Sequence, residues 1–154
     1  MSTQTITQNN PFSGTVPTVQ VHSRGRLWTG RVFSGLCILF LALDSIAKVF
    51  QVQPVLDATV QLGWPTSVVF SLGVTLLSCV VLYAIPRTSV LGALLLTGYL
   101  GGAVATHLRI GDPLFSHTLF PIYVASLAWG GLVLRDARLR AFLRATFFNG
   151  GEPR

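Results

Sequence analysis

Residues 58–86, ATVQLGWPTSVVFSLGVTLLSCVVLYAIP, form a continuous run without a charged side chain. A helix that crosses the hydrocarbon core of a bilayer needs about 20 mainly apolar residues, and this run is longer than that. Two more uncharged runs, residues 88–108 and 113–134, are also long enough to cross. An earlier and shorter apolar stretch, residues 32–43, ends at Asp44. The spacing of charges therefore predicts four membrane-spanning helices.

The overall composition supports the same class of protein. Only 10% of the 154 residues are charged and 51% are hydrophobic, whereas a typical soluble domain has about 25% charged residues. The net charge of +6 would suit a nucleic-acid-binding protein if the basic residues covered a soluble domain, but they flank the apolar runs, so no nucleic-acid partner is expected. The predicted fold class is all-α: an integral membrane four-helix bundle whose surroundings are the lipid bilayer.

The basic residues are divided unequally between the two predicted sides of the membrane. Nine arginines precede the first span, separate the second from the third or follow the fourth, whereas only Lys48 and Arg109 belong to the opposite side. Because positive residues accumulate in cytoplasmic loops, both termini are predicted to be cytoplasmic. The chain then divides into a disordered cytoplasmic N-terminal segment (1–26), a four-span bundle (27–134) and a basic amphipathic cytoplasmic tail (135–154).

Three features predict local structure within and between the spans. The connector at residues 51–63 is too polar for the bilayer centre, and Pro54 favours a short interfacial helix there. Gly98 and Gly102 form a GxxxG pair that permits close helix packing, although glycine is also common in membrane helices without that role. Pro121 lies inside the fourth run and predicts a kink.

The sequence carries no recognisable catalytic or metal-binding motif. Cys37 and Cys79 both lie inside predicted spans and lack the spacing of a zinc site. Histidines on two different helices do not define a metal site either, so no metal is predicted. A nucleophile elbow, a phosphate-binding loop and a dinucleotide fingerprint are also absent from the sequence. No catalytic residue is therefore assigned, and no cofactor is evident.

Ionisable residues near the span ends are the strongest candidates for a functional site. A charge at the centre of a membrane helix costs roughly 2.5–3.5 kcal/mol on insertion scales. Asp44 and Lys48 are one helical turn apart, in the order that favours an ion pair. The predicted topology brings six polar side chains to the outer face: Asp44, Lys48, His107, Arg109, Asp112 and His117.

Two interpretations of this outer cluster are open. A polar mouth on an apolar bundle is typical of a site that handles a small molecule or protons, and histidine titrates near neutral pH. Alternatively, Asp44 and Lys48 form an ion pair retained for packing, and the histidines and loop charges are solvated at the interface. The aromatic residues Tyr99, Tyr123 and Trp129 are compatible with a slot for a quinone ring, and equally with bundle packing.

Several motifs resemble the DoxX-like family of small four-helix bacterial membrane proteins. They are FLALDSIAKVF in the first span, LGWP before the second, IPR between the second and third, GYLGGAVATHLRIGDPL across the third span and its exit, and RDARLR after the fourth. Together they cover about residues 27–140. The chain departs from the family at Asp44-Ser45, where a small Ser-Gly type pair is common.

The resemblance implies a multi-pass protein of the bacterial cytoplasmic (inner) membrane. Members of the broader family are associated with membrane redox systems, as small subunits of thiosulfate:quinone oxidoreductase and as partners of soluble thiol or superoxide enzymes. We therefore expect an accessory or anchoring subunit with a soluble or membrane oxidoreductase partner. The alternatives are a quinone-linked oxidoreductase subunit with a polar site at the outer face, and a small-solute or proton transporter; homo-oligomerisation is open.

Overall fold

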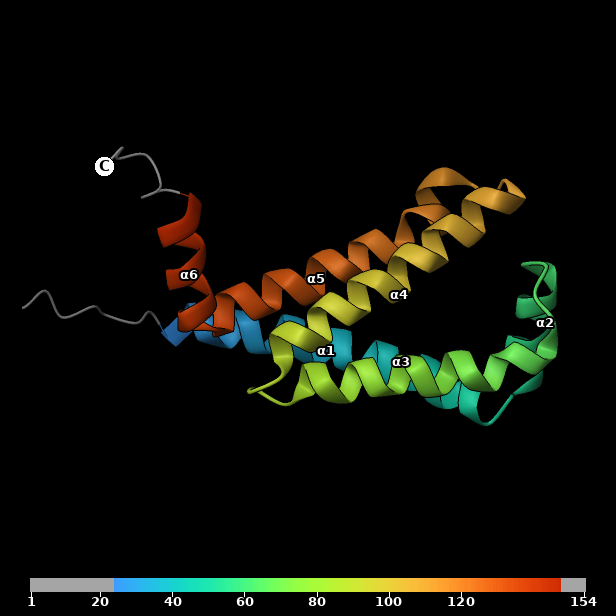
Figure 1. Cartoon of the computed structure of the whole chain (residues 1–154), viewed down its shortest axis with the longest axis horizontal. Helices are drawn as coiled ribbons and strands as arrows, with labels where there is room; N and C mark the ends of the chain where they lie inside the picture. The colour runs from blue at the N-terminus through green and yellow to red at the C-terminus, as the bar shows by residue number, and fades with distance from the viewer. Residues whose placement is uncertain (1–23, 148–154) are drawn as a thin grey trace, which may run out of the picture.

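The computed structural model describes residues 24–147 and contains only helices and turns over that range (Figure 1). The N-terminal segment predicted at 1–26 lies almost wholly outside the described residues, as does the end of the predicted tail, residues 148–154. Residues 24–26 already belong to the first helix. The rest of the predicted tail forms a helix of its own.

Four helical segments are long and apolar enough to cross a membrane, which confirms the predicted four-span bundle. The elements are α1 (Arg24–Val49), η1 (Thr66–Val68) continuing into α3 (Val69–Ala84), α4 (Ser89–Ile110), and η2 (Leu114–Thr118) leading into α5 (Phe120–Arg135). Two shorter helices, α2 (Gln53–Gln61) and α6 (Ala137–Phe147), lie at opposite ends of the bundle (Figure 1). The short helix predicted around Pro54 is thus present as α2, with proline in its first turn.

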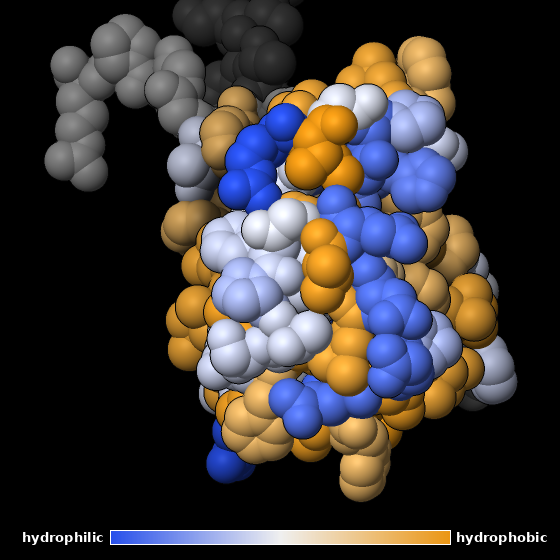
Figure 2. All heavy atoms as spheres, turned by 90° about the vertical axis from the view of Figure 1, so that its right-hand side faces the viewer, coloured by the Kyte–Doolittle hydropathy of each residue, from blue (hydrophilic) through white to orange (hydrophobic). Residues whose placement is uncertain are grey.

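The four long helices pack as a bundle in which α1 and α4 each contact both α3 and α5. Within the described residues the backbones of α1 and α4 do not approach each other closely, so these helices lie diagonally across the bundle. The flanks of the bundle are apolar: Leu36, Leu39 and Leu43 of α1 are each more than half exposed. Figure 2 shows hydrophilic side chains gathered over one end and hydrophobic ones along the flanks. This surface suits lipid and not water.

The two ends of the bundle differ in charge. The arginine-rich end consists of the start of α1, the turn between α3 and α4, the end of α5, and α6, and it holds every arginine of the described residues except Arg109. The pocket end consists of the last turns of α1 and α4 together with α2 and η2, and it holds Lys48 and Arg109. The charge asymmetry predicted between the two sides is therefore present in space. Which end faces the cytoplasm stays a prediction.

Close glycine contacts hold the helices together toward the arginine-rich end. A Cβ added at Gly30 would lie 2.8 Å from Leu134 Cβ, and one at Gly131 would lie 2.6 Å from Ser34 Oγ. On the other side of the bundle, a Cβ at Gly92 would lie 2.2 Å from Tyr83 N. Since these positions admit no side chain, α1 approaches α5 and α3 approaches α4 at backbone distance.

A buried polar network fills the space between these crossings. Tyr83 is fully buried; its hydroxyl donates to the Ala128 carbonyl oxygen at 2.7 Å and lies 3.0 Å from Ser34 Oγ. Arg135 donates through Nη2 to the Tyr83 carbonyl oxygen at 3.0 Å, with its guanidinium 5.0 Å from the centroid of the Tyr83 ring. The network links α1, α3 and α5, and its side chains occupy the space between these helices in this half of the bundle.

Two local predictions have a different outcome in the structure. Pro121 does not kink a continuous helix. The π-helical turn η2 ends at Thr118, and Pro121 falls in the first turn of α5. The N–H groups of a first turn have no partner within the helix, so proline, which lacks this group, costs no helical hydrogen bond there. Gly98 and Gly102 do not form a helix contact within the described chain, because a Cβ at either position would meet no atom within 4 Å. They border a cavity instead.

Candidate functional site

A cavity of about 670 Å³ lies in the half of the bundle nearer the pocket end. Its walls come from all four long helices, and the segment after α2 contributes Leu62 and Trp64. The side chains of Phe40, Tyr99 and Phe120 give it aromatic walls. The rings of Phe40 and Phe120 also contact each other edge to face, with centroids 5.4 Å apart, where α1 meets α5.

The cavity exists because α3 and α4 separate after their close crossing at Gly92 (Figure 1). Small residues of α4 face the space that opens, namely Gly98, Gly102 and Ala103. Ser71 and Thr75 of α3 border it from the other side and are exposed. The cavity is therefore reached laterally between α3 and α4, on the flank that contacts the membrane.

Asp44 and Lys48 place an ion pair in the cavity wall. Both residues line the cavity, and Lys48 Nζ bonds Asp44 Oδ1 one helical turn away. The two side chains are partly buried, with 36% of Asp44 and 18% of Lys48 exposed. The pair leaves this wall without net charge, which lowers the free energy needed to place either group inside a membrane bundle.

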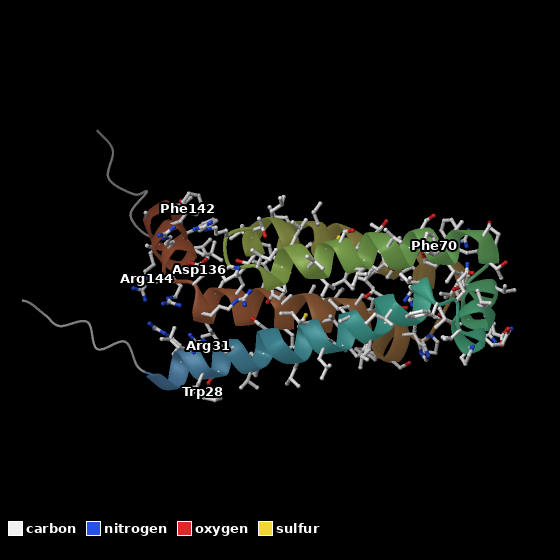
Figure 3. All side chains as sticks on the ribbon, turned by 90° about the horizontal axis from the view of Figure 1, so that it is seen from below. Trp28, Arg31, Phe70, Asp136, Phe142 and Arg144 are labelled. Carbon is white, nitrogen blue, oxygen red and sulfur yellow. The ribbon has the colours of Figure 1, made fainter. Side chains whose placement is uncertain are left out.

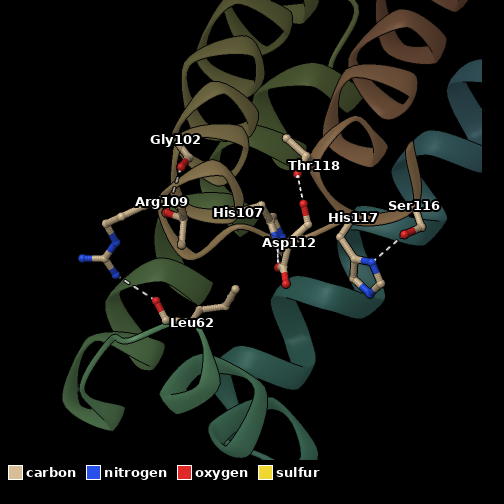
Figure 4. Close-up of polar contacts among 9 residues, drawn as sticks. Leu62, Gly102, His107, Arg109, Asp112, Ser116, His117 and Thr118 are labelled. Atoms are coloured by element: carbon tan, nitrogen blue, oxygen red, sulfur yellow. Dashed lines mark hydrogen bonds and ion pairs between the residues drawn. The ribbon is translucent and has the colours of Figure 1, made fainter. Parts of the chain in front are cut away.

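His107 adds a titratable ring to the same cavity (Figure 4). Gly111 ends α4 in the left-handed conformation, with φ of 74°, and so turns the chain back onto the last turn of the helix. Asp112 consequently lies beside His107, with Oδ2 2.6 Å from Nδ1 of the ring. The contact with Asp112 orients the ring and leaves its Nε2 as the nitrogen available to a ligand.

Arg109 and His117 belong to the same end but do not line the cavity. Arg109 donates through Nη2 to the Leu62 carbonyl oxygen at 2.8 Å and lies 5.3 Å from the centroid of the Trp64 ring. It therefore fastens the segment that covers the cavity. His117 is exposed, with Nδ1 2.8 Å from Ser116 Oγ, and its ring centroid is 6.2 Å from that of His107 (Figure 4).

All six residues predicted for the outer cluster thus lie at the pocket end, and three of them line the cavity. The three lining residues are Asp44, Lys48 and His107. Two others contact lining residues: Asp112 contacts His107, and Arg109 donates a hydrogen bond to Leu62 in the segment after α2. The predicted aromatic slot is divided, because Tyr99 lines this cavity whereas Trp129 lines a separate groove between α4 and α5.

Hydroxyl-bearing side chains in the wall were missed by sequence reasoning. Thr59, Thr75 and Thr106 line the cavity, and each donates its hydroxyl to a carbonyl oxygen of its own helix at 2.7–2.9 Å. Each hydroxyl oxygen thereby keeps acceptor capacity toward the cavity. Ser71 and Thr75 are one helical turn apart, and that spacing is the sequence signal that would have placed them on one face.

The cysteines and the carboxylates do not assemble into a metal site in the part of the chain that the structure describes. Cys37 and Cys79 are free and buried in the apolar core, and neither lines the cavity. Over residues 24–147, no three side chains of histidine, cysteine, aspartate or glutamate lie close enough to hold an ion together.

Comparison with known proteins identifies the family. The model of the DoxX-like family matches residues 32–131, which is well over half of the chain and includes most of each spanning helix. No curated protein and no solved structure matches the chain. The matched region contains the cavity-lining residues Asp44, Lys48 and His107. This multi-pass membrane protein therefore belongs to the DoxX-like family.

Proposed function

We propose that this DoxX-like protein is an accessory subunit of a redox system in the bacterial cytoplasmic membrane and that its cavity binds a small amphiphilic ring compound of the quinone class. The observation that carries the proposal is the cavity itself, about 670 Å³ in volume, with apolar walls and one ion pair. Pockets for small organic ligands typically measure about 300–1,000 Å³ and combine apolar walls with a few polar groups.

The residues of the cavity fit the two parts of such a ligand. Phe40, Tyr99 and Phe120 offer aromatic surface to a flat ring. Quinone carbonyl oxygens accept hydrogen bonds, and Lys48 of α1 and the Ser71 hydroxyl of α3 supply donors in the cavity lining. The lateral opening between α3 and α4 lets an apolar tail remain in the membrane. When bound, a quinone would supply reversible uptake of two electrons and two protons.

The chain's own polar groups would form hydrogen bonds with the ring. Lys48, held by Asp44, donates without bringing net charge into the cavity. His107, held by Asp112 through Nδ1, leaves Nε2 to form a hydrogen bond with the ring. Electrons come from the partner protein in this proposal, which is why the role is that of an accessory subunit.

The transport alternative receives less support from the packing. A path across the membrane would have to continue from the cavity through the half occupied by Tyr83, Ser34 and Arg135. That half is closed by glycine crossings at backbone distance. Transport would require those helices to separate, whereas ligand binding from the membrane requires no such movement.

Photo-crosslinking tests the proposal. The full chain is purified into lipid nanodiscs and labelled with a photoactivatable ubiquinone analogue, with and without excess unlabelled quinone. We expect competed label on peptides of α3 and α4 and on the region of Lys48. Gly102→Leu should reduce that label about tenfold or more, because the new side chain enters the cavity and meets no atom at its Cβ.

The matched control is Gly35→Leu, which adds the same side chain at a site on α1 that is also free of neighbours and lies outside the cavity wall. Its labelling should equal that of the unmodified protein. Equal labelling of the Gly102→Leu protein would refute quinone binding in the cavity. The accessory role is tested separately, by asking whether an oxidoreductase co-purifies stoichiometrically from mild detergent; recovery of the chain alone would contradict it.

A further inference from the structure

We infer that Arg26, Arg140 and Arg144 at the arginine-rich end form a binding site for the phosphate of an anionic phospholipid. These residues lie on two elements at this end of the bundle, the first turn of α1 and the helix α6. The site is independent of the cavity and of its proposed ligand.

The position of α6 is fixed by hydrogen bonds at its first turn. Asp136 breaks the helical path after α5 with an extended backbone, and its Oδ1 accepts the N–H groups of Arg138 and Leu139 at 2.8 and 3.1 Å. Leu139 packs against the core of the bundle. As a result α6 turns away from the axis of α5 and runs crosswise to it at this end (Figure 1), the direction of a helix at a membrane surface.

Arg140 is anchored so that its charge stays at this end. Its Nη1 donates to the carbonyl oxygens of Val133 and Leu134 at 2.7 and 2.6 Å, in the last turn of α5. Burial lowers the pKa of Arg140, and the nearby charges of Arg26 and Arg144 lower it further. Arg26 and Arg144 therefore add positive charge to the surroundings of Arg140.

No carboxylate forms an ion pair with these arginines in the described part of the chain, while the charge of Asp136 raises the pKa of Arg140. The two ion pairs of the described residues both lie at the pocket end, and Asp136 is engaged with the backbone of α6. Among the described residues, Arg26 Nε is the buried side-chain nitrogen or oxygen that has no hydrogen-bond partner. A buried donor without a partner is costly, and a phosphate oxygen would satisfy it while neutralising the cluster.

Apolar side chains beside the cluster favour a lipid as the source of the phosphate. Figure 3 shows Arg31 and Arg144 at the same end of the molecule as Trp28 and Phe142. Trp28 is 69% exposed and Phe142 65% exposed. The spanning helices put this end at the bilayer surface, where aromatic rings are favoured and where anionic headgroups attract arginine. A soluble acidic ligand would leave these rings in water.

Native mass spectrometry of the full chain in detergent tests the site. The protein is titrated with phosphatidylglycerol and, separately, with phosphatidylcholine of the same acyl chains. We expect one phosphatidylglycerol to be retained at concentrations at which phosphatidylcholine is not. Arg26→Gln and Arg144→Gln should each weaken that binding about tenfold or more, the loss expected for a charge-assisted hydrogen bond.

Arg87→Gln is the matched control, because Arg87 is an exposed arginine of the α3–α4 turn at the same end. We expect it to weaken binding less than about threefold, as a change in the general surface charge would. An equal loss in Arg87→Gln, or equal retention of phosphatidylcholine, would overturn the site. Displacement of the lipid by an equal concentration of inorganic phosphate would show a free-phosphate site and would also overturn the lipid assignment. Arg144 is exposed, so its variant keeps the test valid if Arg26→Gln fails to fold.

Discussion

At the arginine-rich end a Cβ at Gly92 would lie 2.2 Å from Tyr83 N, whereas further along α4 a Cβ at Gly98 would meet no atom within 4 Å. The same residue type thus permits contact between α3 and α4 at one point and leaves space between them at another, although at the pocket end Gly73 of α3 also packs closely on α1, where a Cβ would lie 2.8 Å from Lys48 Cβ. The difference lies in the helix axes, because α3 and α4 touch at Gly92 and then separate. Where two helix axes converge, a glycine permits contact between the backbones, and where the axes diverge, a glycine leaves space between the helices.

The largest expected effect comes from adding one methyl group at the crossing. Gly92→Ala should destabilise the fold by more than about 3 kcal/mol, since the new Cβ meets the backbone of α3, which cannot move without separating the helices. Unfolding in mixed micelles, followed by circular dichroism, measures the change in the free energy of unfolding.

Gly98→Ala is the control for that experiment. It adds the same methyl group to the same helix in open space, so its stability should stay unchanged or rise by roughly 0.5–1 kcal/mol through the better helix propensity of alanine. Similar destabilisation of both variants would show that the two halves do not differ as described.

The four spans and the clustering of charges at one end could be predicted from the sequence because both depend on spacing along the chain. Uncharged runs give the spans, and alternation of direction brings Asp44, His107 and Arg109 to one side. The sequence also contains the glycines, but it does not reveal which of them lie at crossings. Gly98 and Gly102 match the packing motif and yet border a cavity, while the contact forms at Gly92.

The cavity and the start of α5 were not predictable for related reasons. The volume depends on the angle between α3 and α4, and no local pattern encodes an interhelical angle. Pro121 was expected to kink a span because the uncharged run begins well before it. The π-helical turn η2 occupies that earlier part instead and ends just before α5, where proline is well accommodated.

A smaller effect is expected from the polar network of the closed half. Tyr83→Phe removes the hydroxyl that reaches Ser34 and the Ala128 carbonyl oxygen, and should lower the free energy of unfolding by about 1–2 kcal/mol. Tyr123→Phe is the comparison, because Tyr123 is 49% exposed and its loss of a hydroxyl should change stability by less than about 0.5 kcal/mol. A neutral Tyr83→Phe would mean that glycine contacts alone hold this half together.

The smallest effect is expected in the open half, at the ion pair of the cavity wall. Lys48→Met leaves the Asp44 carboxylate without its partner, but both side chains are partly exposed to the cavity, so the loss should be only about 1 kcal/mol. Adding Asp44→Asn to the same protein removes the unpaired charge and should restore most of that stability, and this recovery measures the coupling between the two residues. The quinone label should fall in the single and in the double variant alike, since each lacks the Lys48 donor. An ion pair retained for packing alone would instead leave the label unchanged in the double variant, so stability and labelling together distinguish a structural pair from one that binds a ligand.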